Sequence, residues 1–308
     1  MTKLKKSKVK KAGLALFVII IFITVPIISA EFFDVFKKDV SLAPSQDTEV
    51  AVSVGNAAPT IVSVSAIPAT DPIGGTTKII TFQFTAQDTN GASNLNDASA
   101  SASFAKSGEP TRTGTCSFVS TAGNQKTYSC TVTMQYYDDN GVWTVSVSIQ
   151  DQAAATGSDS STSFTYNLLR DITIIPTLIS FPTTIQGSTN LLSTTQTSIT
   201  NKGNFNTPTD GSIQVTGFDL KGAITPTETI PASNFKSGDT SAVDVCTVVG
   251  GGTTLSNGVA TNIAGATLTK GVSGGGTIKY CLTIVPTGIS DQNYVANVAN
   301  SNIWRIGI

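Results

Sequence analysis

A strict alternation of apolar and polar residues between positions 127 and 151 constrains the fold of this chain more than any other feature. Even positions from 128 to 136 hold Tyr, Cys, Val, Met and Tyr, and odd positions from 143 to 149 hold Trp, Val, Val and Ile. A period of two residues is the pattern of a β-strand with one buried face. Asp-Asp-Asn-Gly at 138–141 interrupts it with residues that favour tight turns. The stretch therefore predicts a β-hairpin with a cysteine on its first strand and Trp143 on its second.

Similar short segments, bounded by Gly, Pro, Asn and Asp, recur along the chain, and none shows a helical period. They predict strands at 61–64, 79–86, 115–119, 127–136, 142–149 and 163–168, and weaker ones at 178–181, 197–200, 212–220, 242–249, 277–285 and 303–308. A linker is expected at 170–176. The fold class should be all-β, with one antiparallel β-sandwich at 57–169 and a second at 170–308, a division that we favour over one large sheet.

Four cysteines fall in two pairs, one in each expected sandwich. Cys116 and Cys130 lie in the first sandwich, and Cys246 and Cys281 lie in the second. In an exported protein this placement predicts two intradomain disulfides, each stabilising its sandwich by roughly 3–4 kcal/mol. Four cysteines allow three connectivities, and four buried free thiols are the alternative. We expect the first bridge to lie in or near the core with Trp143.

The first 30 residues have the features of an export signal. Six lysines within the first 12 residues precede an apolar run that ends in Ser29-Ala30. This pattern predicts a secretory signal peptide or an uncleaved N-terminal membrane anchor at 1–30. Lys10-Lys11-Ala12-Gly13 also resembles the class III signal of archaeal type IV pilins, which would keep the apolar helix. In each case the remainder of the chain would lie outside the cytoplasm.

Residues 31–56 are expected to form a linker that contains one short strand. Val50, Val52 and Val54 alternate with Ala51 and Ser53 before a Gly-Asn-Ala-Ala-Pro break. This strand is either the first strand of the following sandwich or a free strand that pairs with the sheet edge of a neighbouring molecule.

The absence of histidine restricts the chemistry open to this chain. Without histidine there is no Ser-His-Asp triad, no Cys-His dyad and no imidazole metal ligand. No pair of carboxylates stands out as a general acid and base, so we expect no catalytic residues, no cofactor and no enzyme activity. From Glu31 onward the chain has 13 basic and 20 acidic residues, so we also expect no nucleic-acid partner.

Two clusters of side chains with oxygen donors could bind calcium. Asp88 and Asn90 belong to the first cluster, and Asp138 and Asp139, with Asp151 near them, form the second. Ca²⁺ prefers such ligands, but Asp and Asn are also ordinary turn formers and neither cluster has EF-hand spacing. We therefore favour turns and keep calcium as the alternative.

Three segments share features with a known class of modules: Thr81-Phe82-Gln83-Phe84-Thr85-Ala86-Gln87-Asp88, Tyr128-Ser129-Cys130 and Asn140-Gly141-Val142-Trp143-Thr144-Val145. Together they resemble the immunoglobulin-like and PKD-like modules of prokaryotic, archaeal-type surface proteins. The resemblance covers about a third of the chain. It implies a β-sandwich closed by the Asp-x-x-Gly-x-Trp hairpin. It departs from antibody domains, whose disulfide spans two sheets over a longer loop.

These observations favour a non-enzymatic extracellular or cell-surface protein that serves as a structural or adhesive component of the cell envelope. A surface-layer or filament subunit and an adhesin both fit. Expected partners are other envelope proteins or copies of the chain itself, with the membrane contacted only through the N-terminal segment. The alternative is a glycan-binding accessory module, for which Tyr137 is the most plausible exposed aromatic side chain.

Overall fold

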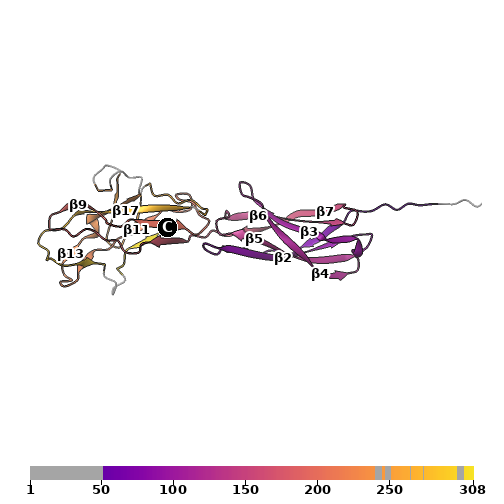
Figure 1. Cartoon of the computed structure of the whole chain (residues 1–308), viewed down its shortest axis with the longest axis horizontal. Helices are drawn as coiled ribbons and strands as arrows, with labels where there is room; N and C mark the ends of the chain where they lie inside the picture. The colour runs from indigo at the N-terminus through magenta and orange to yellow at the C-terminus, as the bar shows by residue number, and fades with distance from the viewer. Residues whose placement is uncertain (1–50, 240–244, 247–250, 264, 273, 297–301) are drawn as a thin grey trace, which may run out of the picture. The chain divides into compact units, whose positions relative to one another are not determined.

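The computed structural model describes residues 51–239, 245–246, 251–263, 265–272, 274–296 and 302–308. The chain divides at Gly55, and Asn56–Ile308 forms one compact unit. The described residues form antiparallel sheets without an α-helix (Figure 1), which confirms the all-β prediction. The predicted signal or anchor helix at 1–30 lies outside the described residues. None of the residues described belongs to a helix long and apolar enough to cross a membrane.

The N-terminal β-region, residues 56–169, is one seven-stranded sheet with the order β1-β2-β5-β4-β3-β6-β7. Its strands are β1 (Thr60–Val64), β2 (Thr77–Gln87), β3 (Leu95–Ala105), β4 (Arg112–Ala122), β5 (Gln125–Gln135), β6 (Gly141–Asp151) and β7 (Thr156–Tyr166). The sheet folds over so that its two halves face each other. Phe82 on β2 and Phe104 on β3 show this, because their ring centroids lie 5.6 Å apart although the two strands are not neighbours. The result is a sandwich-like layer pair around one apolar core.

The alternation in the sequence explains which side chains enter this core. On β5 the buried side chains include Tyr128, Cys130 and Met134, and on β6 Trp143 is completely buried. The Trp143 Nε1 donates a hydrogen bond to the carbonyl oxygen of Asp139 at 2.8 Å. The predicted inward faces of both strands are therefore confirmed.

The predicted hairpin between these two strands is wrong. β5 pairs with β2 and β4, whereas β6 pairs with β3 and β7. The connection at 136–140 instead crosses from one half of the sheet to the other. Asp138 is buried there, where its carboxylate accepts the backbone N–H of Gln135 at 2.7 Å and pairs with the Arg112 guanidinium. This buried ion pair holds the connection inside the fold, so it is not the exposed tip of a hairpin.

Two further predictions near the region boundaries are corrected. The predicted linker at 170–176 contains a strand, β8 (Ile172–Ile175), and the predicted strand at 178–181 is not one. Residues 51–54, the described part of the predicted strand at 50–54, form no strand either. β8 pairs with β10, whereas residues 178–181 and 51–54 have no strand partner among the described residues.

The C-terminal β-region, residues 170–308, contains shorter strands in several sheets. They are β8, β9 (Thr189–Leu192), β10 (Thr197–Asn201), β11 (Gln214–Thr216), β12 (Leu220–Gly222), β13 (Thr229–Ile230), β14 (Phe235–Asp239), β15 (Thr253–Thr254), β16 (Ala260–Asn262), β17 (Gly275–Ile284), β18 (Tyr294–Val295) and β19 (Arg305–Gly307). One sheet has the order β15-β14-β17-β10-β8, with β9 also on β17. The others have the orders β16-β11-β19 and β13-β12-β18.

The two regions share part of their strand order, although β4 pairs with β3 whereas β14 pairs with β15. The run β8-β10-β17-β14 repeats β1-β2-β5-β4, and the pairs β11–β19 and β12–β18 repeat the pair β3–β6. β7 lies on the outer edge of β6 in the N-terminal region. Among the described residues, no strand occupies the corresponding edge of β18 and β19. The C-terminal region therefore has the N-terminal arrangement without its seventh strand.

Candidate binding groove

The C-terminal β-region has a groove at the place of this seventh strand. Its volume is about 1320 Å³, above the range of about 300–1,000 Å³ that is usual for small-molecule pockets. Its lining includes residues 174, 176–186, 289–296 and 303–306. The size and the position along β18 and β19 suit an extended peptide better than a small ligand.

The groove leaves the core of the C-terminal region incompletely covered. In the described part of the chain, the N-terminal core has 19 buried residues and 3 partly buried apolar neighbours. The C-terminal core has 13 buried residues and 13 partly buried ones. Eight of those 13 line the groove, among them Phe181, Trp304 and Ile306. Apolar side chains that β7 would cover in the N-terminal region thus remain partly exposed to solvent here.

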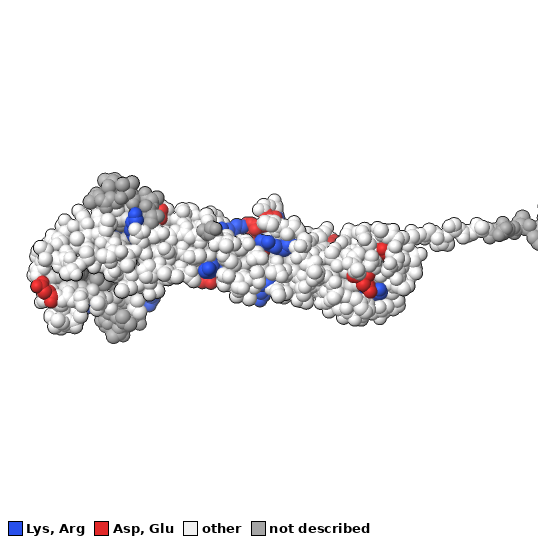
Figure 2. All heavy atoms as spheres, in the orientation of Figure 1, with Lys and Arg blue, Asp and Glu red and all other residues white. Residues whose placement is uncertain are grey.

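The lining is apolar and nearly free of charge. Leu178, Ile185, Ile224, Val295 and Ile303 line it, and their exposed fractions range from 43% to 81%. Only one acidic and one basic side chain, those of residues 291 and 305, belong to the lining. Charged side chains are also sparse over the described surface of the molecule on the face shown in Figure 2. An exposed apolar surface of this kind marks an interaction site more often than it marks an ordinary surface.

Aromatic side chains pack against one another in the floor of the groove. Trp304 stacks edge-on against Phe235, with ring centroids 5.0 Å apart, and lies 6.1 Å from Tyr280. Its Nε1 donates to the carbonyl oxygen of Phe218 at 2.8 Å. Because Trp304 is half-buried and lines the groove, its fluorescence should report on an occupant.

One wall is held by a cluster of hydrogen bonds to the carboxylate of Glu228. The backbone N–H and hydroxyl of Ser290 donate to it at 2.7 and 2.8 Å, and Gln292 and Tyr294 each donate at 2.7 Å. These donors, the Ser290 N–H first and the Tyr294 hydroxyl next, lower the pKa of Glu228 to about 2. The carboxylate is therefore ionised at neutral pH and ties residues 290–294 to the segment before β13.

This pKa shift predicts that acid weakens the groove wall. A carboxylate whose folded pKa is depressed stabilises the fold fully above its unfolded pKa, about 4.3 for Glu, and this contribution is lost as the pH falls toward 2. We expect the wild type to lose stability between pH 5 and pH 2, and Glu228→Gln to lose less over that range because it cannot be protonated. Thermal unfolding followed by Trp304 fluorescence measures this, with Asp291→Asn as the exposed control. Equal pH profiles for Glu228→Gln and the wild type would contradict the assignment.

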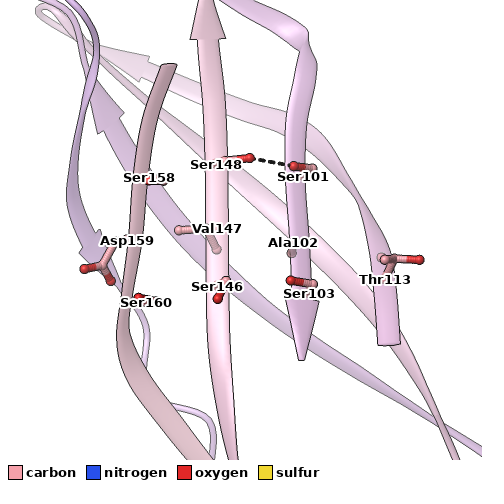
Figure 3. A pocket seen from close by; sticks show the side chains of 11 residues that line it. Ser101, Ala102, Ser103, Thr113, Ser146, Val147, Ser148, Ser158, Asp159 and Ser160 are labelled. Atoms are coloured by element: carbon pink, nitrogen blue, oxygen red, sulfur yellow. Dashed lines mark hydrogen bonds between the residues drawn. The ribbon is translucent and has the colours of Figure 1, made fainter. Parts of the chain in front are cut away.

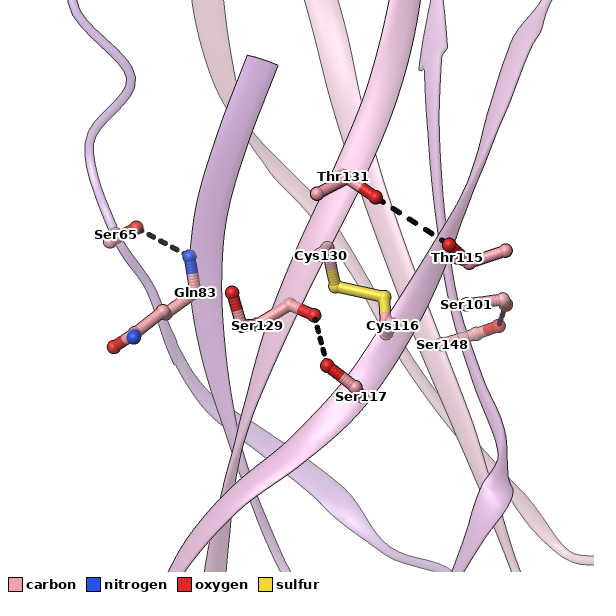
Figure 4. The surroundings of a disulfide bond; sticks show 10 residues. All are labelled: Ser65, Gln83, Ser101, Thr115, Cys116, Ser117, Ser129, Cys130, Thr131 and Ser148. Atoms are coloured by element: carbon pink, nitrogen blue, oxygen red, sulfur yellow. Dashed lines mark hydrogen bonds between the residues drawn. A yellow bond between two sulfur atoms is a disulfide. The ribbon is translucent and has the colours of Figure 1, made fainter. Parts of the chain in front are cut away.

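The structure contains two disulfides. Cys116 on β4 faces Cys130 on β5, and the bridge links neighbouring strands of one sheet (Figure 4), unlike the bridge across two sheets in antibody domains. The second bridge joins Cys246, which follows β14, to Cys281 on β17. In both regions a disulfide therefore ties the fourth strand, or the loop after it, to the fifth.

The structure disperses the residues considered for calcium. Asp151 lies with the first cluster, because Asn56 donates to it and Asn94 donates both to Asn56 and to Asp88. The 11 residues of β6, which span roughly 33 Å, lie between it and the second cluster. Asp88 accepts the Asn90 N–H at 2.7 Å, and Asp139 pairs with Lys270 at 2.7 Å. Among the described residues, no group of three or more Asp, Glu, Cys or His side chains is placed to hold a metal ion.

The carboxylate of Asp151 anchors the start of the N-terminal region. Asn56 Nδ2 donates to it at 2.6 Å, and the backbone N–H groups of Ala153 and Ala155 donate at 2.9 Å. Asn94 Nδ2 also donates to the Asn56 side-chain oxygen at 3.1 Å. The Asn56 amide first, and then these backbone groups, lower the pKa of Asp151. The carboxylate has the role of a turn and anchor residue.

Two polar features of the N-terminal β-region lie outside the groove. Tyr137, expected to be exposed, is half-buried and packs edge-on against Tyr136 with ring centroids 5.0 Å apart. A hollow of about 410 Å³ on the outer face of β3, β6 and β7 is lined mainly by serines (Figure 3). Ser101 and Ser148 in it are hydrogen-bonded to each other at 2.8 Å. Neither feature presents an exposed aromatic platform for a sugar.

Sequence reasoning did not locate the groove. The sequence does contain one indication of the groove, the apolar run of Leu178, Ile179 and Phe181. Its pattern predicts a strand. A strand needs a pairing partner, and this run has none among the described strands. A comparison of the strands of the N-terminal region with those expected in the C-terminal region would have indicated that the seventh strand is missing.

Among the solved structures similar to this chain is the secreted serine protease VesC from Vibrio cholerae. The similarity has 8% sequence identity and a TM-score of 0.21, and it covers 76% of this chain and 48% of VesC. The chain thus spans about half the length of VesC, and a similarity this low carries no argument about function. No family model matches the chain, and no curated protein matches it.

The prediction that the chain is not an enzyme is corrected. It is not upheld, because the solved structures that match include a secreted serine protease.

Proposed function

We propose that this protein is an extracellular structural subunit of the cell envelope that assembles with other protein chains through the groove of its C-terminal β-region. The observation that carries the proposal is the open apolar groove beside β18 and β19. Its exposed side chains leave apolar surface in water, which association with another chain would remove. The two disulfides and the all-β fold are consistent with a secreted protein.

The strand order supports a relationship to immunoglobulin-like domains. Constant-type immunoglobulin domains place strands A, B, E and D in one sheet and C, F and G in the other. Taken in chain order, β1-β2-β5-β4 and β3-β6-β7 have the same arrangement. The C-terminal region follows it as far as strand F. Two immunoglobulin-like sandwiches, the second lacking strand G, are therefore the architecture that we propose.

Assembly of the exported, oxidised chain tests this function. We expect sedimentation and negative-stain microscopy to reveal species larger than the 31.8 kDa monomer. Ile185→Asp should reduce assembly, because it places a charge in the groove at a side chain that is 78% exposed and hence not needed for folding. Val259→Asp, at an exposed apolar residue outside the groove, is the matched control. A wild type that stays monomeric across its soluble concentration range would contradict the proposal.

A further inference from the structure

We propose that residues 49–54 of one copy occupy the groove of a second copy and pair there with β18 and β19 as the missing seventh strand. This inference rests on the proposed function, since it names the partner in the assembly. It joins two incomplete features of the same chain, an apolar strand-like segment without a partner and a sandwich without its last strand.

The donor segment has the pattern of a strand with one apolar face. Val52 and Val54 are 81% and 85% exposed, and residues 51–54 form no strand. Ser53 separates the two valines, so in an extended conformation both valines point to one side. In the sequence Val50 continues the same alternation. A segment of this kind gains both apolar burial and backbone hydrogen bonds when it adds to the edge of a sheet.

Within the described part of the chain, the acceptor has a matching unpaired strand edge and an apolar floor. Arg305, Ile306 and Gly307 on β19 pair with β11 on one side only, and β18 pairs only with β12 among the described strands. In the N-terminal region the strand at this position, β7, buries Phe164, whose ring centroid lies 4.7 Å from that of Phe104. An incoming strand would supply the equivalent inward side chains. The uncharged valines suit a lining with only two charged residues.

The donor must come from a second copy, because it cannot reach the groove of its own chain. Asn56 is held by Asp151 at one end of β6. The C-terminal region is attached at the other end, where Asn204 Nδ2 donates to the Asp138 carbonyl oxygen at 3.0 Å. The 11 residues of β6 span roughly 33 Å. The chain from Asn56 back to Glu49 spans at most about 25 Å when fully extended, which is less than the length of β6 alone.

Donation between copies has a consequence for the shape of the assembly. The donor and the groove are different surfaces of the same chain, so each contact is heterologous and leaves one donor and one groove free. Repetition of such a contact builds an open, head-to-tail filament, unless its geometry closes a ring.

Variants of the full chain test the donor. Val52→Asp/Val54→Asp should abolish assembly while leaving the monomer folded, because both side chains are exposed in the monomer and a buried charge is costly. Ser53→Asp is the matched control and should still assemble, since its side chain points away from the groove. Wild-type assembly by the double variant would overturn the inference and leave the proposed function standing. A monomeric wild type would remove the proposed function itself.

A synthetic peptide of residues 47–57 tests the acceptor. Added to the double variant, whose groove is free, it should bind and change the tryptophan fluorescence, and this change should be absent in Trp304→Phe, which keeps Trp143. Val295→Asp in the groove wall should weaken binding by about tenfold or more, because the charge would contact the apolar face of the peptide. Val259→Asp should leave binding unchanged. Absence of peptide binding, or binding unaffected by Val295→Asp, would overturn the groove as the acceptor.

Discussion

Replacing Trp143 with alanine should lower the free energy of unfolding of the N-terminal β-region by about 4–5 kcal/mol. Trp143 is completely buried, and its Nε1 donates to the Asp139 carbonyl oxygen at 2.8 Å. The substitution removes a large apolar side chain, leaves a cavity in a closed core and breaks that hydrogen bond. Since small domains are stable by about 5–15 kcal/mol in total, the loss would be a large part of the stability.

Urea unfolding followed by circular dichroism measures this effect. Val142→Ala is the control on the same strand, because Val142 points outward and is 62% exposed, and it should change the stability by no more than about 0.5 kcal/mol. Trp304→Ala in the open C-terminal region should cost less in the monomer than Trp143→Ala, since Trp304 is only half-buried. A loss below about 1 kcal/mol for Trp143→Ala would mean that the core rearranges to fill the space.

Removing Arg112 should destabilise the same region by about 3–5 kcal/mol, because it leaves a buried carboxylate without its counter-ion. The Asp138 side chain is completely buried, and the Arg112 Nε donates to its two oxygens at 3.1 and 2.9 Å. In Arg112→Ala the carboxylate would retain the Gln135 N–H as a hydrogen-bond donor. This loss is large because the charge remains in the interior after its partner has gone.

Two comparison variants separate this effect from the removal of a surface charge. Lys126→Ala breaks an ion pair with Asp97, whose side chain is 44% exposed, and should cost less than about 1 kcal/mol. Arg112→Lys should give an intermediate loss, because an ammonium cannot reproduce the two-pronged contact of a guanidinium. If Arg112→Ala were no more harmful than Lys126→Ala, water would have to reach Asp138 in the variant.

The buried faces of strands were predictable, and their pairing partners were not. The alternation through Tyr128, Cys130 and Trp143 identified the inward side chains of β5 and β6. A period of two residues contains no information about which strand lies alongside. The turn residues at 138–141 suit a hairpin and a crossing connection equally well. In the crossing connection Asp138 is buried in an ion pair with Arg112, which is remote in the sequence.

β3 was missed because its two faces differ little in hydrophobicity. It alternates alanine with serine, and Ala100, Ala102 and Phe104 face the core. Alanine is not favoured in strands, so neither propensity nor contrast marked the segment. Much of β7 was missed for a similar reason, because serine and threonine dominate its sequence. Both strands become recognisable only when the neighbouring strands supply their partners.

The candidate groove was the least predictable feature, because it is defined by a strand that the region lacks. The sequence did indicate the other half of the proposed contact, since Val50, Val52 and Val54 stood apart from the following sandwich. Their proposed role as a donor strand needs the free edge of β19, which only the sheet order reveals.

The two disulfides also determine how the chain would respond to tension applied along its length. Each bridge transmits the force directly between its two cysteines, which are 14 positions apart in one case and 35 in the other, so the enclosed segment is not stretched. At about 3.5 Å per residue, these two segments have a combined contour length of roughly 170 Å, which cannot extend while the bridges are intact. An oxidised molecule stretched beyond its folding limit would therefore extend by that much less than a reduced one.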